Sequence, residues 1–329
     1  MKLARRKFLH LAAGALSMPA IARAAWAQTY PARPITIIVP FAAGGGTDTT
    51  ARILAERMTA SLGQTLIIEN VAGAGGTIGV GRATRAAGDG YTLSLGTVST
   101  HVLNGPVYPV QYDVLKDLEP VALISAEPLL IVSRKDLPAT NLAELIAWLK
   151  ANSNKASSGH PGAGTAPHMA NVVFQKQTGT RFQLIPYRGT GPSMQDLVAG
   201  QIDMEIDPTS NSLPQVRAGR IRAYAVAANT RLNAAPEIPT VEEAGLPGFH
   251  ASLWYGLWAT KGTPKDVIGK LNGAVVDALG NPAVRKRLTD LGHELYPRDR
   301  QTPEVLAAFH KAEIEKWWPI VREAGIKPE

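Results

Sequence analysis

The residues best suited to chemistry in this sequence lie in glycine-containing loops that follow predicted strands. The first loop, the glycine triplet at residues 44–46, follows the β-branched run of residues 35–40 and precedes Thr47 and Asp48. A glycine triplet between a strand and a helix lets the backbone approach a ligand closely, and it presents free N–H groups at the positive end of the helix. An isolated loop of this kind is explained by a tight turn. Here several such loops, rich in Thr, Ser, Gly and Asn, follow successive strands, which favours the binding of an anion.

Neither nucleotides nor nucleic acids suit these loops. Residues 44–46 lack the Lys-Ser/Thr pair of a phosphate-binding loop, and residues 73–79 space their glycines as G-x-G-x-x-x-G. The chain has 34 Lys+Arg and 27 Asp+Glu, a net charge of +7, but residues 1–27 hold five bases and no acid, so the rest carries only 7 − 5 = +2. That charge is too small for a nucleic-acid interface.

Catalytic and metal sites are also poorly supported. The serine, threonine and histidine at residues 99–101 are adjacent in the chain, and no G-x-S-x-G elbow or orienting acid accompanies them. His101, His160 and His168 lack the spacing of metal ligands, and the chain has no cysteine. The sequence therefore predicts no catalytic residue, no metal and no cofactor, and it leaves a periplasmic hydrolase as a weak alternative.

The first 27 residues have the layout of an export signal. Arg5-Arg6-Lys7 precedes an apolar stretch over residues 8–21 and then small residues, a pattern that resembles a twin-arginine signal peptide. The apolar stretch is shorter than the ~20 residues that span a bilayer. We expect cleavage near Ala27, with residues 22–24 as the alternative site, and a mature protein in the periplasm.

Alternating strand and helix patterns predict an α/β fold. Short apolar runs at residues 35–40, 65–69 and 91–95 are each followed by a loop and a helical pattern, which indicates mainly parallel sheets flanked by helices. We expect two such lobes with a ligand cleft between them and a two-segment hinge. The first lobe comprises residues 28–123 and 230–329, and the second comprises residues 124–229.

Several motifs together resemble a known family of receptors. They are residues 30–48, which read YPARPITIIVPFAAGGGTD, and residues 70–76, 89–93, 187–189 and 195–203. In this order they resemble the substrate-binding receptors of tripartite tricarboxylate transporters, the TctC-like or Bug family, over essentially the whole mature chain. The resemblance implies a type II periplasmic binding protein that is not an enzyme, binds a small organic carboxylate as a monomer and delivers it to separate membrane components. Sensing for a signalling partner remains an alternative.

The resemblance also implies which residues hold the ligand. The candidates are loop residues of both lobes: Ala43, Gly44, Gly45, Thr47, Asp48, Thr97, Thr100, His101, Ser158, Gly162, Gly164, Thr165, Gly189 and Asp207. Asp48 and Asp207 cannot pair with an anion directly, so we expect each to cap a helix or orient a bridging water. Two departures from the family pattern, Asn104-Gly105 and residues 207–211, predict a change at the distal end of the pocket. The identity of the carboxylate is left open.

Overall fold

The computed structural model describes residues 30–328. The predicted export signal and its cleavage site near Ala27 lie outside the described residues. Within the described part of the chain, no helix combines the length and the apolar character needed to cross a bilayer.

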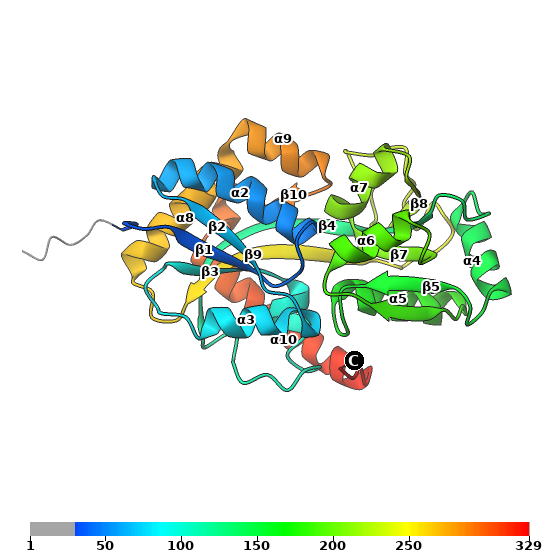
Figure 1. The fold of residues 1–329 in the computed structure, drawn as a ribbon, viewed down its shortest axis with the longest axis horizontal. Coiled ribbons are helices and arrows are strands. Elements are labelled where there is room, and N and C mark those ends of the chain that lie inside the picture. The colour runs from blue at the N-terminus through cyan, green and yellow to red at the C-terminus, as the bar shows by residue number, and fades with distance from the viewer. Residues whose placement is uncertain (1–29, 329) are drawn as a thin grey trace, which may run out of the picture.

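The first lobe is built on a sheet whose strands follow the order β2-β1-β3-β9-β4 (Figure 1). β1 pairs in parallel with both β2 and β3, as predicted, and its residues are buried because helices cover both faces. The elements of this lobe outside the shared strands are β1 (Ile35–Val39), α2 (Gly46–Leu62), β2 (Leu66–Asn70), α3 (Thr77–Thr84), β3 (Thr92–Thr97), α8 (Lys265–Gly280), α9 (Pro282–Asp290), β10 (Glu294–Leu295) and α10 (Pro303–Glu323). A short π-helix, η2 (Ser99–Leu103), follows β3.

The second lobe repeats the plan with shorter strands. β5 pairs in parallel with β6 and β7, and helices cover the sheet. Its elements are α4 (Leu142–Ala151), β5 (Ser157–His160), α5 (Ala166–Thr178), β6 (Gln183–Pro186), α6 (Thr190–Val198), β7 (Met204–Pro208), α7 (Thr209–Arg217) and β8 (Ile221–Val226). Asn141 caps α4, because its side chain accepts a hydrogen bond from the Glu144 N–H at 2.9 Å.

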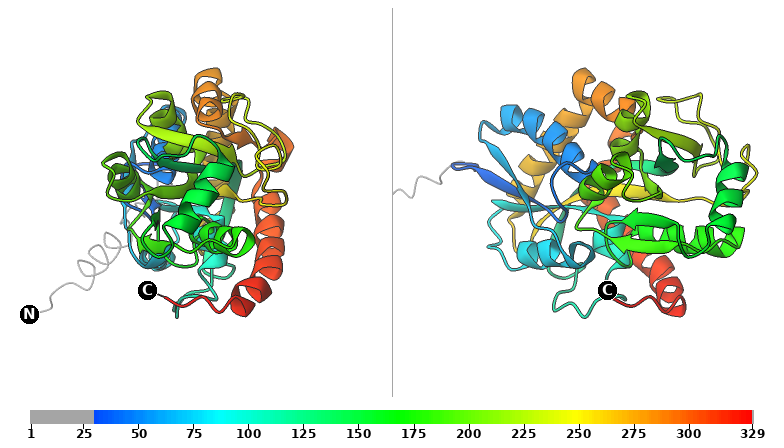
Figure 2. Two further views of the ribbon diagram at one scale, coloured as in Figure 1. Left: turned by 90° about the vertical axis from the view of Figure 1, so that its right-hand side faces the viewer. Right: turned by 45° about the vertical axis from the view of Figure 1, so that its right-hand side comes forward.

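Two long strands join the lobes (Figures 1 and 2). β4 (Leu118–Arg134) pairs antiparallel with β9 (Ser252–Thr260) as far as Pro128, and from Leu129 onward it pairs antiparallel with β7 and β8. The complete sheet is therefore mixed, with parallel pairs at its outer strands and antiparallel pairs along the strands that both lobes share. These shared strands form the hinge.

The chain returns to the first lobe later than the predicted boundary at residue 230. Leu232, Ala235 and Ile238 pack in a cluster with Leu130 and Leu213 of the second lobe. We therefore propose that the second crossover lies at β9, and that the boundary predicted at residue 230 belongs later in the chain.

Three parts of the secondary structure differ from the prediction. α2 begins at Gly46 within the glycine triplet, whereas a start at residue 50 was expected. Residues 157–160 were expected to be a loop, but they form strand β5, which pairs with both β6 and β7. Glycine is required within it, because a Cβ atom on Gly159 would lie 2.8 Å from a Glu205 carboxylate oxygen. α7 and α9 were not predicted.

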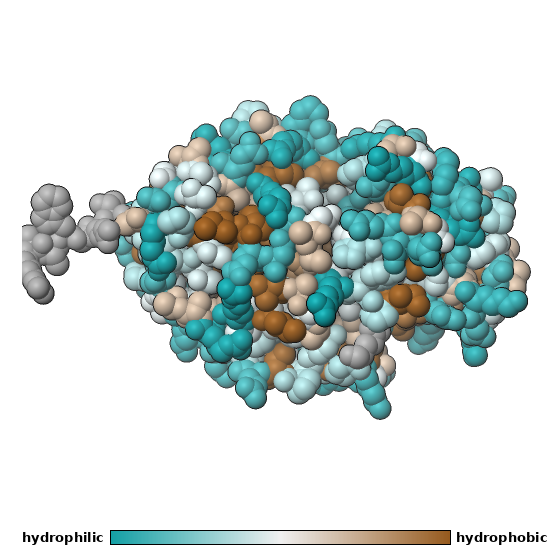
Figure 3. Space-filling view, in the orientation of Figure 1, coloured by the Kyte–Doolittle hydropathy of each residue, from teal (hydrophilic) through white to brown (hydrophobic). Residues whose placement is uncertain are grey.

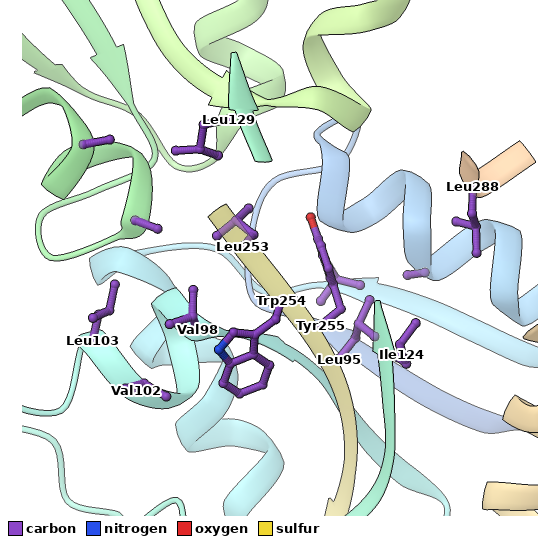
Figure 4. Packing of buried hydrophobic residues seen from close by; sticks show 14 of the residues in the cluster. Leu95, Val98, Val102, Leu103, Ile124, Leu129, Leu253, Trp254, Tyr255 and Leu288 are labelled. Atoms are coloured by element: carbon purple, nitrogen blue, oxygen red, sulfur yellow. The ribbon is translucent and has the colours of Figure 1, made fainter. Parts of the chain in front are cut away.

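The aromatic residues of β9 belong to the core, as their apolar sequence predicts. Trp254, Tyr255 and Trp258 are each at most 5% exposed. Figure 4 shows Trp254 and Tyr255 on opposite sides of the strand, with the Tyr255 hydroxyl directed toward the start of α2. The hinge strand thus supplies apolar packing on one side and a buried hydroxyl on the other.

Candidate functional site

A small cavity lies where the two lobes meet. It is lined by loop residues and by residues at the ends of helices and strands of both lobes, together with one residue of β9: Phe41, Ala42, Gly45, Thr47, Asp48, Thr97, Ser99, Pro161, Pro167, Thr190, Pro208 and Leu253. Its volume of about 20 Å³ is room for about one water-sized group. None of the described residues that line it is a lysine, arginine or histidine, and the one acidic residue among them is Asp48.

Two helix N-termini face each other at this cavity. Gly45 is the N-cap of α2, and Thr190 is the first residue of α6 in the opposite lobe. A Cβ atom on Gly45 would lie 2.8 Å from the Thr190 hydroxyl oxygen and 3.1 Å from the Gly191 nitrogen. Because each helix carries partial positive charge at its N-terminus, the two ends together form a place for negative charge between the lobes.

The lobes touch directly around the cavity. The Ala42 N–H donates to the Arg188 carbonyl at 2.9 Å, and the Ala166 N–H donates to the Ser99 hydroxyl at 3.0 Å. A Cβ atom on Gly189 would lie 3.0 Å from the Ala42 nitrogen. The glycine loops therefore let the two lobes approach each other. Their glycines were predicted only to let the backbone approach a ligand.

Asp48 organises the first loop but does not cap α2 as predicted, because the N-cap is Gly45 and Asp48 lies in the first turn of the helix. Its buried carboxylate accepts hydrogen bonds from the Gly44 N–H, the Asn70 side-chain amide and the Arg52 guanidinium, each at 3.0 Å. Burial acts to raise the pKa of Asp48, but these hydrogen bonds outweigh it and hold the pKa below the ordinary value of 3.8. Asn70 also donates to the Phe41 carbonyl at 3.0 Å, so one ionic cluster fixes both ends of the loop.

Asp207 lies beside the cavity but does not line it. Its carboxylate accepts hydrogen bonds from the Ser212 hydroxyl at 2.6 Å and from the Asn211 side chain at 2.9 Å, both in the first turns of α7. Burial raises the pKa of Asp207 to about 8, although those two hydrogen bonds act in the opposite direction. Pro208, the next residue, supplies the cavity wall.

Thr97 lines the cavity, whereas Thr100 and His101 line a separate one. That second cavity, of about 400 Å³, lies in the first lobe between residues 110–116 and α10. His101 stacks on Trp258 with ring centroids 4.1 Å apart, and Thr100 accepts a hydrogen bond from the Thr97 N–H at 3.1 Å. Both residues therefore support the loop after β3 from behind.

The candidates from residues 158–165 shape their own loop. The N–H groups of Gly162 and Gly164 are directed to the Nδ1 atoms of His160 and His168, at 3.2 and 3.4 Å. The Thr165 hydroxyl donates to the Gly162 carbonyl at 2.7 Å.

Ser158 is not among the residues that line the cavity, and its hydroxyl donates to the side-chain oxygen of Asn171 at 2.8 Å. The neighbouring prolines, Pro161 and Pro167, are the residues of this region that line the cavity.

Sequence reasoning missed eight of the lining residues: Phe41, Ala42, Ser99, Pro161, Pro167, Thr190, Pro208 and Leu253. Seven of them are immediate or near neighbours of predicted residues, so the loops were identified but not the side of each loop that faces the cleft. Ala43 and Gly44 were predicted but do not line the cavity; they lie against Gly191 of the opposite lobe instead. Leu253 carries no polar signal in the sequence. No cluster of three or more metal-binding side chains occurs between residues 30 and 328.

Comparisons with known proteins agree with this architecture. A sequence model of the Tripartite tricarboxylate transporter family receptor, TctC, matches residues 50–326. The chain belongs to this receptor family. The predicted family is therefore confirmed.

Individual relatives of this receptor match it over nearly its whole length. A protein of Agrobacterium vitis, described as the UPF0065 protein in the TAR-I ttuE-ttuC' intergenic region, is 38% identical over 320 residues, covering 97% of this chain and 92% of that protein. The structure of the periplasmic binding protein BugD is 38% identical with a TM-score of 0.87, covering 91% of this chain and 100% of that one. MatC from Rhodopseudomonas palustris with bound malate is 39% identical with a TM-score of 0.84, covering 89% and 100%. The two-lobed type II fold is confirmed.

Proposed function

We propose that this receptor captures a small organic carboxylate between its lobes in the periplasm and delivers it to the membrane components of a tripartite tricarboxylate transporter. The observation that carries the proposal is the meeting of the α2 and α6 N-termini at a cavity with no lysine, arginine or histidine among its described lining residues. Two helix ends and several hydroxyl groups suit a carboxylate, and they leave its charge without a fixed cation. The malate bound to MatC supports this ligand class.

Capture requires the lobes to move. In this arrangement of the lobes the cavity of about 20 Å³ cannot hold even a four-carbon acid. The ligand therefore enters when the lobes separate, and the lobes close around it with a wider gap than in this structure. Binding through backbone N–H groups of both lobes gives the ligand a higher affinity for the closed arrangement, and that difference drives closure. A receptor of this kind releases its ligand when a membrane partner favours the open arrangement.

Export and monomeric state belong to the same proposal. The Arg5-Arg6 motif supports export to the periplasm. On the face in Figure 3, hydrophobic residues form small, separate patches among hydrophilic ones, as expected where a chain does not bury that face against another copy. The receptor needs no cofactor, and it performs no chemical step on its ligand.

A thermal-shift screen of the ligand-stripped mature protein against aliphatic and aromatic carboxylates tests the proposal. We expect a higher melting temperature with one class of acid and no shift with the matching neutral amides, because ligand binding to the folded state stabilises it. Mass spectrometry should recover the acid unchanged. Uniformly flat curves would contradict carboxylate capture, and turnover of an ester or amide panel would favour a hydrolase.

A variant at the cavity localises the effect. Gly45→Asp should abolish the shift, because it places a like charge and extra volume at the start of α2. Gly273→Asp on α8, where a Cβ atom meets nothing within 4 Å, is the matched control and should bind as the wild type does.

A further inference from the structure

We propose that the receptor takes up a proton together with its carboxylate, and that Glu205 and Asp207 hold this proton behind the wall of the cavity. The inference rests on the proposed capture of a carboxylate and adds a regulation by pH to it. The observations behind it are two buried acidic side chains and the helix turn that joins them to the cavity.

Glu205 and Asp207 form a buried pair in the second lobe. They are two residues apart on β7, so both side chains leave the same face of the strand. Each residue is only 2% exposed. Asp207 directly precedes Pro208, which lines the cavity. The pair therefore lies just behind the wall that faces the ligand.

One oxygen of Glu205 lacks the donor that an ionised carboxylate requires. Its Oε1 atom is buried, and no residue between 30 and 328 donates a hydrogen bond to it. A Cβ atom on Gly159 would lie 2.8 Å from this oxygen, so the neighbouring strand packs closely against it. Burying an ionised carboxylate oxygen without a partner is strongly unfavourable, whereas a neutral carboxyl group costs far less. The geometry therefore suits a protonated Glu205.

The charged groups around the pair are acidic as well. Besides Asp207, the charge of Asp196 on α6 acts on Glu205. The charge of Glu127 on β4 acts on Asp207, although Glu127 has donors of its own from residues 209, 210 and 255. Tyr187, which follows β6, donates its hydroxyl to Asp196 at 2.7 Å. Burial, together with these acids, raises the pKa of Glu205 well above 4.5 and that of Asp207 to about 8.

The other elements packed against β7 face the pair with neutral groups. α7 contributes the side chains of Asn211 and Ser212, which donate hydrogen bonds to the aspartate. β5 contributes Gly159. The next residue of that strand, His160, leaves the opposite face and lies against His168 of α5. In the described part of the chain, the pair therefore has no cation in contact, and a proton is what neutralises it.

Asp48, the acidic residue that lines the cavity, does not take this proton. Burial acts to raise the pKa of Asp48, but hydrogen bonds, that from Arg52 first among them, hold the pKa below the ordinary value of 3.8. Asp48 stays ionised at neutral pH, and the Arg52 guanidinium at 3.0 Å balances its charge. Proton uptake near pH 8 therefore belongs to the pair on β7.

The first turn of α6 connects the pair to the cavity. Thr190 lines the cavity, and its carbonyl accepts hydrogen bonds from the Asn211 side chain and the Ser193 hydroxyl, both at 3.1 Å. The Asn211 side chain also donates to Asp207 at 2.9 Å. Ser193 also lies next to Glu205, whose pKa its hydroxyl acts to lower. One helix turn therefore separates the ligand charge from the two acids.

This closeness couples the proton to the ligand. A carboxylate at the α6 N-terminus raises the proton affinity of both acids, because a nearby negative charge disfavours their ionised forms. The coupling is reciprocal, so a protonated pair raises the affinity for the carboxylate. The receptor therefore holds its ligand more tightly in mild acid and releases it more readily as the pH rises above 8.

Isothermal titration calorimetry in phosphate and in Tris measures the proton uptake, because the two buffers differ in their enthalpy of ionisation. The probes are succinate, adipate and benzoate, whose carboxyl groups are ionised at pH 6.5 and at pH 8. We expect uptake of about 0.3–0.5 proton per bound acid at pH 8, where Asp207 is half protonated, and almost none at pH 6.5. An acid that binds at pH 8 without proton uptake would overturn the inference and leave carboxylate capture intact. Binding of none of the three acids would instead remove the proposed function.

The double variant Glu205→Gln/Asp207→Asn assigns the uptake to the pair. It replaces two neutral acids by neutral amides of the same size, so it should fold. Proton uptake at pH 8 should disappear in this variant. Glu237→Gln removes a carboxylate at an exposed position and should keep the wild-type uptake. Unchanged uptake in the folded double variant would overturn the role of the pair.

Carbon-13 NMR of the unliganded wild-type protein tests the same assignment without any variant. The side-chain carboxyl resonances of Glu205 and Asp207 should titrate above pH 6.5. Titration of both resonances near pH 4 would overturn the inference, even if the double variant does not fold.

Discussion

A Cβ atom on Gly191 of α6 would lie 2.8 Å from the carbonyl oxygen of Ala43, which belongs to the opposite lobe. The same atom would lie 2.9 Å from the Gly45 nitrogen, and both neighbours are backbone atoms that cannot rotate away. Gly191 lies inside a helix and has no positive φ, so its backbone conformation does not require glycine. What requires glycine is the approach of the two lobes.

Gly191→Ala should therefore hold the lobes apart without unfolding either one. Alanine is the better helix former by about 1 kcal/mol, so the melting temperature of the unliganded protein should not fall. Ligand affinity should rise, because the substitution disfavours an arrangement of the lobes whose cavity is too small for a ligand. Small-angle scattering should show a larger radius of gyration than for the wild type.

Gly273→Ala provides the control for this substitution. It adds the same methyl group to helix α8, where nothing lies within 4 Å of the new atom. This variant should match the wild type in scattering and in affinity. A Gly191→Ala protein that scatters and binds like the control would show that the lobe contact does not limit closure.

Asp48→Asn should loosen the loop that carries the α2 N-terminus. The carboxylate accepts from Gly44, Arg52 and Asn70, and an amide cannot accept all of these hydrogen bonds at once. We expect the free energy of unfolding to fall by about 1–3 kcal/mol in urea titrations at pH 7. Asp113→Asn, in a partly exposed loop pair with Lys116, should cost less than about 1 kcal/mol.

The pH dependence distinguishes the charge of Asp48 from its shape. Because the pKa of Asp48 is lower in the folded state than its ordinary value of 3.8, its stabilising contribution is present above that value and is lost as the pH falls through the lower folded pKa. The difference in stability between wild type and Asp48→Asn should therefore shrink in acid. A difference that stays constant down to pH 2 would rule out an ionic role.

Much of the fold could be read from the sequence because its signals are local. The β-branched run at residues 35–40 predicted a strand, and the motif order predicted the family. The strand at residues 157–160 gave no such signal, since Ser-Ser-Gly-His has no apolar alternation. Gly159 in this strand is explained by Ser193, Ile202 and Glu205, which lie far along the chain and would crowd a Cβ atom at this position.

The site was predictable at the level of loops but not of facing atoms. Thr97 and His101 lie in the same segment, yet one lines the cleft and the other stacks on Trp258 behind it. His101 lies within the π-helix Ser99–Leu103, which begins two residues after Thr97 and was not predicted. Glu127 gave no signal either, because its four donors come from residues 209, 210 and 255, which tertiary folding alone brings to it.

His160 and His168 should make the protein less stable in mild acid. Burial lowers the pKa of each to about 4, and their rings lie 4.7 Å apart. The unfolded chain takes up protons below the ordinary histidine pKa of 6.5, whereas the folded protein does so only near 4. Stability contributed by these neutral rings is therefore fully present above pH 6.5 and is lost as the pH falls toward 4.

Melting temperatures between pH 4.5 and 7.5 check this expectation. His168→Asn keeps an acceptor for the Gly164 N–H but cannot take up a proton in this range, so its melting temperature should change less with pH than that of the wild type. His250→Asn, at an exposed position, should retain the wild-type slope. Equal slopes in all three proteins would contradict a role for the buried pair.

Asp207 should make the protein less stable as the pH rises, which is the opposite of the effect of the two histidines. Its pKa is raised by burial to about 8, so between about pH 4 and 8 the folded protein holds a proton that the unfolded chain has lost. The stability from this group is fully present below the ordinary carboxyl pKa and is lost as the pH rises through 8. Glu205, whose pKa burial and Asp207 raise, changes stability in the same direction.

Asp207→Asn should therefore reduce the loss of melting temperature between pH 6.5 and 8.5, without removing the part that belongs to Glu205. The same ionisation adds a negative charge beside Pro208 in the cavity wall, so carboxylate affinity should fall above pH 8 in the wild type and stay level in the variant. Asp290→Asn, at an exposed helix end, should behave as the wild type does in both measurements. If the variant loses affinity above pH 8 as steeply as the wild type, the charge responsible lies elsewhere in the site.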